Sequence, residues 1–218
     1  NLSIKLTQQQ KNYQEELSLA TEIQRAILPE NSPEWENTIT EWSDRVRIKT
    51  LYSPASELAG DFYDVISISK HKIGFLIIDV MGHGVRASLI VAMIRGLISK
   101  EQGSASSPDE FLASLNHGLC HILIKAGITM FSSAIYCVID VDSGSLTLAS
   151  AGHPMPILKN GSNYKLLDSG SSKTGTALGL VSVSDYEPTT IPLSDLDEII
   201  FYTDGIYEVI NAKNEELG

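Results

Sequence analysis

The sequence lacks the features that would carry it through a membrane or onto a nucleic acid. No apolar run approaches the roughly 18 residues that span a bilayer, and no basic start with an apolar middle marks a signal peptide. The 16 basic residues are outnumbered by 27 acidic ones, which leaves a formal charge of -11. Because a phosphate-backbone binder needs a basic surface, we expect no nucleic-acid partner and no membrane contact.

Cysteine and zinc-type motifs are also scarce. Cys120 and Cys137 are the two cysteines; they show no metal-ligand spacing and lie in apolar runs, which predicts buried free thiols in a reducing compartment. His117 and His121 are four residues apart on one predicted helix, but no third zinc ligand accompanies them. We therefore expect a cytoplasmic protein or, because the chain begins at Asn1 rather than Met, the cytoplasmic part of a larger sensor.

What is present fits one sizeable domain with a short appendage. The chain has 218 residues, of which 43% are hydrophobic. Residues 2–28 contain no glycine or proline, and Pro29 ends the helix that this segment predicts. We assign residues 1–30 to an N-terminal linker helix, residues around Pro33 to a polar linker, and residues 45–218 to the main domain.

The linker helix has a partial heptad pattern. Its apolar side chains are Leu6, Tyr13, Leu17, Ala20 and Ile27. Such a half-loaded seam predicts a helix that packs on a partner surface, either its own domain or a second copy of the chain. We expect a homodimer through this helix, with upstream sensor domains moving it.

The main domain alternates hairpin strands with two adjacent long helices. Ser107, Pro108 and Glu110 give the second helix an explicit start. Because this order is not a βαβ rhythm, it predicts antiparallel sheet layers covered by helices. The predicted strands are 46–52, 61–69, 72–79, 130–141, 145–150 and 198–202, and the predicted helices are 87–100, 107–125 and a short one from 206.

Three aspartates share one kind of setting. Asp61 opens a predicted strand, Asp79 closes one and Asp204 follows one, each with glycine nearby. A carboxylate at the end of an apolar strand is costly to bury unless a cation or donor meets it, and carboxylate oxygens suit Mg²⁺ or Mn²⁺. An aspartate next to glycine is more often a turn, so the residues alone leave both readings open.

Several segments, taken in order, resemble the SpoIIE/RsbU branch of the PPM (protein phosphatase 2C-like) superfamily. Together they extend over nearly the whole chain from residue 19, and the longest of them is specific. The segments are LATEIQRAILP at 19–29, SPASELAGDFYDV at 53–65, DVMGHGV at 79–85, AGHP at 151–154 and YTDG at 202–205.

The resemblance implies an α-β-β-α four-layer sandwich of antiparallel sheets and a binuclear Mn²⁺ or Mg²⁺ centre. By motif position, the catalytic metal-binding carboxylates would be Asp61, Asp79 and Asp204, and Val80 would offer its backbone carbonyl. Two ions would clamp a phosphoryl oxygen and lower the pKa of a bridging water that attacks phosphorus. The implied substrate is a phosphoserine or phosphothreonine protein, such as a STAS-type anti-anti-sigma factor in bacterial partner switching.

The sequence departs from the family pattern in places. Members carry a further C-terminal strand with a last metal aspartate, which is missing before Gly218, so we expect a truncated domain with an incomplete metal site. His83 lies beyond the position of the histidine in eukaryotic relatives and receives no role. Asp64 could either contact metal-bound water or stabilise a turn.

Two alternatives to a protein phosphatase stay open at this point. The first is a non-catalytic pseudophosphatase that captures a phosphoprotein without hydrolysing it. The second is a phosphodiesterase or another two-metal hydrolase, which would use the same ions.

Overall fold

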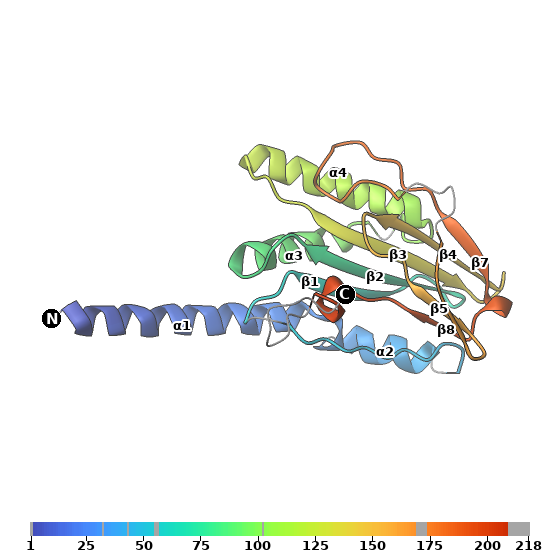
Figure 1. The fold of residues 1–218 in the computed structure, drawn as a ribbon, viewed down its shortest axis with the longest axis horizontal. Helices are drawn as coiled ribbons and strands as arrows, with labels where there is room; N and C mark the ends of the chain where they lie inside the picture. The colour runs from blue at the N-terminus through green and yellow to red at the C-terminus, as the bar shows by residue number, and fades with distance from the viewer. Residues whose placement is uncertain are drawn as a thin grey trace.

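The computed structural model describes residues 2–31, 33–42, 44–54, 57–101, 103–168 and 174–208. Two antiparallel sheets form its centre (Figure 1). The large sheet has the order β1 (Asp61–Ser67), β2 (Lys72–Val80), β3 (Ser132–Asp140), β4 (Ser145–Ala151) and β7 (Thr189–Pro192). The small sheet has the order β6 (Asn163–Leu166), β5 (Ile157–Asn160) and β8 (Glu198–Ile200).

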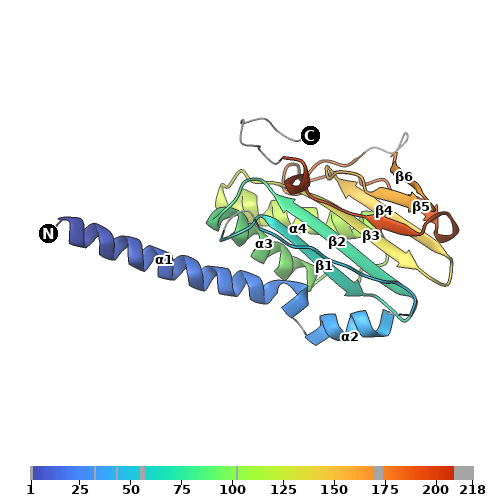
Figure 2. The same ribbon diagram turned by 60° about the horizontal axis from the view of Figure 1, so that its bottom comes forward.

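Two helices cover one face of the large sheet, as Figure 2 shows. They are α3 (Val85–Ile98) and α4 (Pro108–Ala126), close to the predicted ranges. Strand β2 has apolar side chains on both faces: Leu76 and Ile78 pack under the helices, whereas Ile73 lies in a second core that includes Ile199 of the small sheet. This double burial explains the unbroken apolar run of β2.

The layers are therefore helices, large sheet and small sheet. Both sheets are antiparallel throughout, as predicted. The fourth layer of the predicted sandwich, a helical layer over the outer face of the small sheet, stays a prediction. Among the described helices, none is both long and apolar enough to cross a membrane.

The predicted linker around Pro33 is wrong, because a short helix occupies it. Helix α2 (Pro33–Trp42) follows the turn η1 (Pro29–Asn31), and Trp42 is fully buried in the second core. Proline was interpreted as a helix breaker, yet at the first position of a helix its missing N–H costs nothing.

Two predicted strands also differ from the structure. Residues 46–52 are extended but pair with no strand in the part of the chain that is described, although Val46 and Ile48 pack on the second core. Strand β8 is shorter than predicted and half-exposed. The predicted helix from 206 begins as the turn η3 (Asp204–Ile206), and its later residues lie outside the described ranges.

Helix α4 begins where predicted, but without the predicted side-chain cap. Ser107 occupies the N-cap position and makes no capping hydrogen bond with its hydroxyl. The helix start therefore relies on Pro108 and on the acidic residues of the first turn. Between β7 and β8 the chain makes a further short turn, η2 (Leu193–Asp195).

The linker helix α1 (Leu2–Ile27) projects from the domain (Figures 1 and 2). Its C-terminal end packs against the core through Ile27 and the following Leu28. Farther from the domain, Leu6 is 52% exposed and Tyr13 is 59% exposed. The heptad seam is therefore covered by the domain only at its C-terminal end.

Candidate metal centre

Two of the three predicted aspartates face each other across neighbouring strands. Strands β1 and β2 pair antiparallel with Asp61 opposite Asp79. Both side chains are half-buried, and their carboxyl groups hydrogen-bond to each other. The sheet register thus brings together two acids that are 18 positions apart in the sequence numbering.

Asp204 joins this pair from the far end of the chain. It begins η3, and the preceding Thr203 donates a hydrogen bond from its hydroxyl to the Asp61 carboxylate at 2.8 Å. The Asp204 charge lies close enough to raise the pKa of both other aspartates. The structure therefore brings all three predicted aspartates into one acidic cluster.

The cluster is electrostatically costly as it stands. Burial raises the pKa of Asp61, against the hydrogen bonds from Thr203 and Asp79, which lower it. Burial, together with the charges of Asp61 and Asp204, raises the pKa of Asp79 to about 7. Crowded carboxylates either share protons or attract cations.

The donor set suits a hard divalent cation. Carboxylate oxygens and backbone carbonyls are the ligands that Mg²⁺ and Mn²⁺ prefer. Within the described residues, no group of three or more Asp, Glu, His or Cys side chains is arranged so that it could hold a metal ion. Asp61 and Asp79 hydrogen-bond to each other instead, and two carboxyl groups that share a proton take a different geometry from two that bind an ion.

The backbone around the cluster is tightly packed at Gly60. A Cβ atom at this position would lie 2.7 Å from the carbonyl oxygen of Val80 and 2.8 Å from that of Gly82. The Val80 N–H donates to the Gly60 carbonyl at 3.2 Å. Only glycine therefore lets the loop before Asp61 approach the predicted carbonyl ligand of Val80 so closely.

Asp64 does not stabilise a turn, which was one of its two predicted roles; the other, contact with metal-bound water, stays a prediction. It is 5% exposed in the middle of β1 and forms an ion pair with Arg95 of α3 at 2.8 Å. Burial raises the pKa of Asp64 to about 6, although Arg95 and the Val65 N–H lower it. It is therefore a buried link between the sheet and α3. His83 is exposed in the loop that precedes this helix.

Gln24 of the linker helix makes a contact that the sequence analysis missed. Its side chain is buried, donates to the Ala59 carbonyl at 2.7 Å and accepts from the Ala59 N–H at 3.0 Å. One turn earlier, Thr21 donates to the Glu57 carbonyl at 3.1 Å. Helix α1 therefore holds the loop that leads into Asp61. Gln24 interrupts the apolar heptad, and that interruption was the one available signal.

A cleft of about 720 Å³ adjoins the acidic cluster. The extended residues 46–54 form one wall and residues 198–203 form another, and Asp61 and Thr203 line its end. The cleft thus runs between residues 46–54, which belong to no described strand, and residues 198–203, which begin as β8 of the small sheet.

Comparison with known proteins decides the family. The model of the family described as Stage II sporulation protein E (SpoIIE) matches residues 69–218. The chain belongs to the SpoIIE family. Its resemblance to this branch of the PPM superfamily, stated from the motifs, is thereby confirmed.

Two curated relatives of this SpoIIE-family chain come from Bacillus subtilis (strain 168). Phosphoserine phosphatase RsbP is 29% identical over 201 residues, covering 90% of this chain and 46% of the relative. Phosphoserine phosphatase RsbU is 25% identical over 201 residues, covering 91% of this chain and 55% of the relative. The chain thus spans about half the length of these relatives.

Solved structures show the same fold. The SiaA-PP2C domain of Pseudomonas aeruginosa superposes with a TM-score of 0.76 at 22% identity, covering 96% of this chain and 79% of that one. The PP2C phosphatase domain of SpoIIE from Bacillus subtilis, solved with a regulatory fragment, gives 0.54 at 21% identity, covering 69% and 43%. At these identities the likeness establishes the fold of a PP2C-type phosphatase domain.

Proposed function

We propose that this SpoIIE-family chain is the catalytic part of a metal-dependent protein serine/threonine phosphatase, with Asp61, Asp79, Asp204 and the Val80 carbonyl as metal ligands. The observation that carries the proposal is the convergence of three carboxylates with the pKa of Asp79 raised to about 7. Carboxylate and carbonyl oxygens are the ligands that hard divalent ions prefer, and we propose two ions, Mn²⁺ or Mg²⁺.

The protein groups have distinct roles in this proposal. Bound divalent ions would supply Lewis-acid activation of the phosphoryl group and of the hydrolytic water. The Thr203 hydroxyl orients the Asp61 carboxylate, and Gly60 lets the Val80 carbonyl approach. Half-burial of the acids lowers the local dielectric and strengthens their interaction with cations. The proposed scheme uses no covalent phosphoenzyme.

We propose a phosphoserine or phosphothreonine protein as the substrate, specifically a STAS-like anti-anti-sigma factor. RsbP and RsbU, the relatives that support this choice, are phosphoserine phosphatases. A further structural neighbour, from Mycobacterium tuberculosis, joins RsbU and RsbW domains in one protein, Rv1364c. That neighbour has a TM-score of 0.57 at 20% identity, and its domain pair suits a partner-switching circuit.

We also propose that α1 makes a homodimer and regulates the cluster. Leu6 and Tyr13 are exposed on the projecting half of the helix, where a second copy could cover them. Movement of α1 by upstream domains would pull on Ala59 through Gln24, two residues before Asp61. Light scattering of the intact protein at high concentration tests the dimer, and a monomer there would contradict it.

The domain boundaries remain part of the proposal. We keep residues 1–30 as the linker helix and residues 45–218 as the phosphatase domain, to which α2 is joined through buried Trp42.

The decisive test is Mn²⁺-dependent hydrolysis of a phosphoserine protein by the intact protein, beside the variants Asp79→Asn and Asp204→Asn. We expect wild-type turnover and near-complete loss in both variants. Equal activity in all three would contradict the metal assignment. Wild-type binding of the phosphoprotein without turnover would instead indicate a pseudophosphatase, and hydrolysis of a phosphodiester in preference to the phosphoprotein would indicate the other hydrolase class.

A further inference from the structure

His153 is a buried histidine for which the proposed reaction has no role. It is 3% exposed and lies in the AGHP segment, beyond the end of β4. Its ring Nδ1 lies 2.7 Å from the Ser133 hydroxyl, and its Nε2 lies 3.0 Å from the Tyr202 carbonyl oxygen. The ring therefore bridges two segments that are 69 positions apart in the numbering.

The two partners of the ring lead to the acidic cluster from opposite sides. Ser133 of β3 is paired with Asp79 of β2, and Asp79 is paired with Asp61 of β1. These three residues lie on one row across the large sheet. Tyr202, on the other side, precedes Thr203 and Asp204. The ring thus connects the row that carries two of the acids to the segment that carries the third.

The hydrogen-bond partners fix the tautomer of the ring. A carbonyl oxygen can only accept, so Nε2 carries the proton and donates to Tyr202. Nδ1 then accepts from the Ser133 hydroxyl. Burial lowers the pKa of His153 to about 4, against the bond to Tyr202, which raises it. The ring is therefore neutral near pH 7 and adds no charge to the acidic cluster.

The loop that carries His153 has its own support. The Ser150 hydroxyl accepts from the His153 N–H at 3.1 Å and donates to the His153 carbonyl at 2.9 Å. The backbone of His153 is thus held whatever its side chain does. The contacts of the ring serve the 202–204 segment instead, which is also tied to the sheet through Thr203 and Asp61.

We infer that His153 is a positioning residue that fixes the Asp204-bearing segment against the row of Asp61 and Asp79. The inference rests on the proposed function in treating these three aspartates as metal ligands. The hydrogen bonds of His153 themselves need no metal. The bond from Thr203 ends on a proposed metal ligand, whereas the bond from His153 ends on a backbone carbonyl that is not among the proposed ligands. His153 therefore sets the third carboxylate in place before any cation arrives.

Two substitutions at position 153 separate the two bonds of the ring. In His153→Asn the amide oxygen can still accept from Ser133, but the side chain is too short to reach Tyr202. In His153→Gln the amide N–H lies near the former Nε2 and can still donate to Tyr202. A matched control is Tyr136→Phe, which removes another buried hydrogen bond of β3, from Tyr136 to the Ala105 carbonyl at 2.8 Å.

The first readout is amide hydrogen exchange of the intact protein without metal. The reporters are the N–H groups of Ile206, Tyr207 and Glu208, which bond within the η3 turn. We expect exchange about tenfold faster in His153→Asn, from a loss of about 1.4 kcal/mol of local stability, and near-wild-type exchange in His153→Gln. Tyr136→Phe should leave these amides unchanged.

The second readout is Mn²⁺ affinity by titration calorimetry. Loss of a positioning contact typically weakens metal binding by about 10- to 100-fold, so we expect such a loss in His153→Asn, recovery in His153→Gln and no change in Tyr136→Phe. Unchanged exchange in His153→Asn, or equal changes in Tyr136→Phe, would overturn the inference. If wild-type protein bound no Mn²⁺, the proposed function would fail, and the exchange data alone would then decide the role of His153.

Discussion

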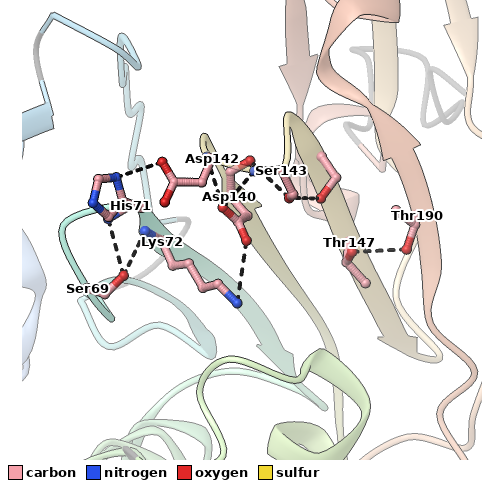
Figure 3. A network of polar contacts seen from close by, with 9 residues as sticks. Ser69, His71, Lys72, Asp140, Asp142, Ser143, Thr147 and Thr190 are labelled. Carbon is pink, nitrogen blue, oxygen red and sulfur yellow. Dashed lines mark hydrogen bonds and ion pairs between the residues drawn. The ribbon is translucent and has the colours of Figure 1, made fainter.

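The two ends of strand β2 place carboxylates in opposite electrostatic settings. At its first residue, Lys72 pairs with Asp140 of β3 at 3.5 Å (Figure 3). Asp140 also accepts backbone N–H bonds from Asp142 at 3.0 Å and Ser143 at 3.2 Å. Burial alone would raise the pKa of Asp140, but the N–H groups of Ser143 and Asp142, together with Lys72, outweigh it and lower that pKa.

At the other end of β2, the neighbours of Asp79 raise its pKa instead of lowering it. Asp79 lies opposite Asp61, with Asp204 nearby, and its pKa rises to about 7 through burial and these two charges. Protein donors and a lysine neutralise the carboxylate at one end, whereas like charges crowd the other. The contrast supports the cation site that we propose at the Asp79 end, because uncompensated negative charge attracts cations.

The largest expected effect is on catalysis, and it should be confined to the Asp79 end of strand β2. Asp61→Asn should lower hydrolysis of a phosphoserine protein by about 10³-fold, because it removes a charge that stabilises the transition state through the ions. Asp140→Asn changes the same chemical group at the other end of the sheet and should leave turnover unchanged. Steady-state rates of the intact protein measure both effects. A similar loss of turnover in the two variants would contradict the prediction that only the Asp79 end of β2 takes part in catalysis.

The second effect is stabilisation by metal. At about 100 times its dissociation constant, Mn²⁺ should stabilise the wild-type protein by about 2.7 kcal/mol, since it binds the folded cluster and not the separated aspartates. Asp140→Asn should retain this gain, and Asp79→Asn should lose most of it. Urea unfolding with and without Mn²⁺ measures the difference. A gain preserved in Asp79→Asn would show that the ion binds elsewhere.

The third effect concerns Asp64, which lies between the two ends on β1. Its pKa is raised from the ordinary aspartate value of 3.8 to about 6, so the folded protein binds this proton at a pH where the unfolded chain does not. Stability should therefore rise as pH falls from about 7 toward 4, by on the order of 2 kcal/mol from this group. Asp64→Asn cannot titrate and should lack that part of the pH dependence.

The comparison of wild type with Asp64→Asn in urea at pH 7.5 and pH 5 isolates this contribution. The variant also leaves Arg95 without its carboxylate partner at both pH values, so the difference between the two pH values is the quantity of interest. Identical pH dependence in the two proteins would mean that Arg95 outweighs burial and holds Asp64 ionised.

The fourth effect tests how the acidic end is anchored from outside the sheet. Gln24→Ala removes both hydrogen bonds to Ala59 and should lower turnover about tenfold, which corresponds to about 1.4 kcal/mol. Gln10→Ala changes the same residue type on the exposed half of α1 and should have no effect. Equal rates in all three proteins would remove α1 from the positioning of Asp61.

The sequence predicted those parts that depend on local pattern. Strand β2 and its hairpin partners follow from apolar alternation and turn residues, and α3 and α4 follow from helical spacing. Residues 46–52 have the same alternation, yet they pair with no described strand, because pairing depends on a neighbour that local pattern does not reveal. Helix α2 was missed because its evidence, burial of Trp42, is tertiary.

The site divides in the same way. The motifs predicted the three aspartates, and the register of β1 with β2 explains why two of them meet. The contacts of Gln24 and of Asp64 were beyond prediction, because their partners lie 35 and 31 positions away. The residues next to a glutamine in a heptad, or next to an aspartate in a strand, do not indicate which distant residue it will contact.

The smallest expected effect is on stability at the other end of the sheet. The folded protein holds the pKa of Asp140 below the ordinary aspartate value of 3.8, so this carboxylate stabilises the fold at neutral pH and loses that contribution as pH falls below 3.8. Asp140→Asn should cost less than about 1 kcal/mol, because the Lys72 pair is partly exposed. The opposite pH dependence of Asp64 and Asp140 can be measured in the same urea experiments. If Asp140→Asn stabilised the protein at pH 7, the ionised carboxylate would be unfavourable at both ends of β2. The comparison would then no longer support a cation site at the Asp79 end in particular.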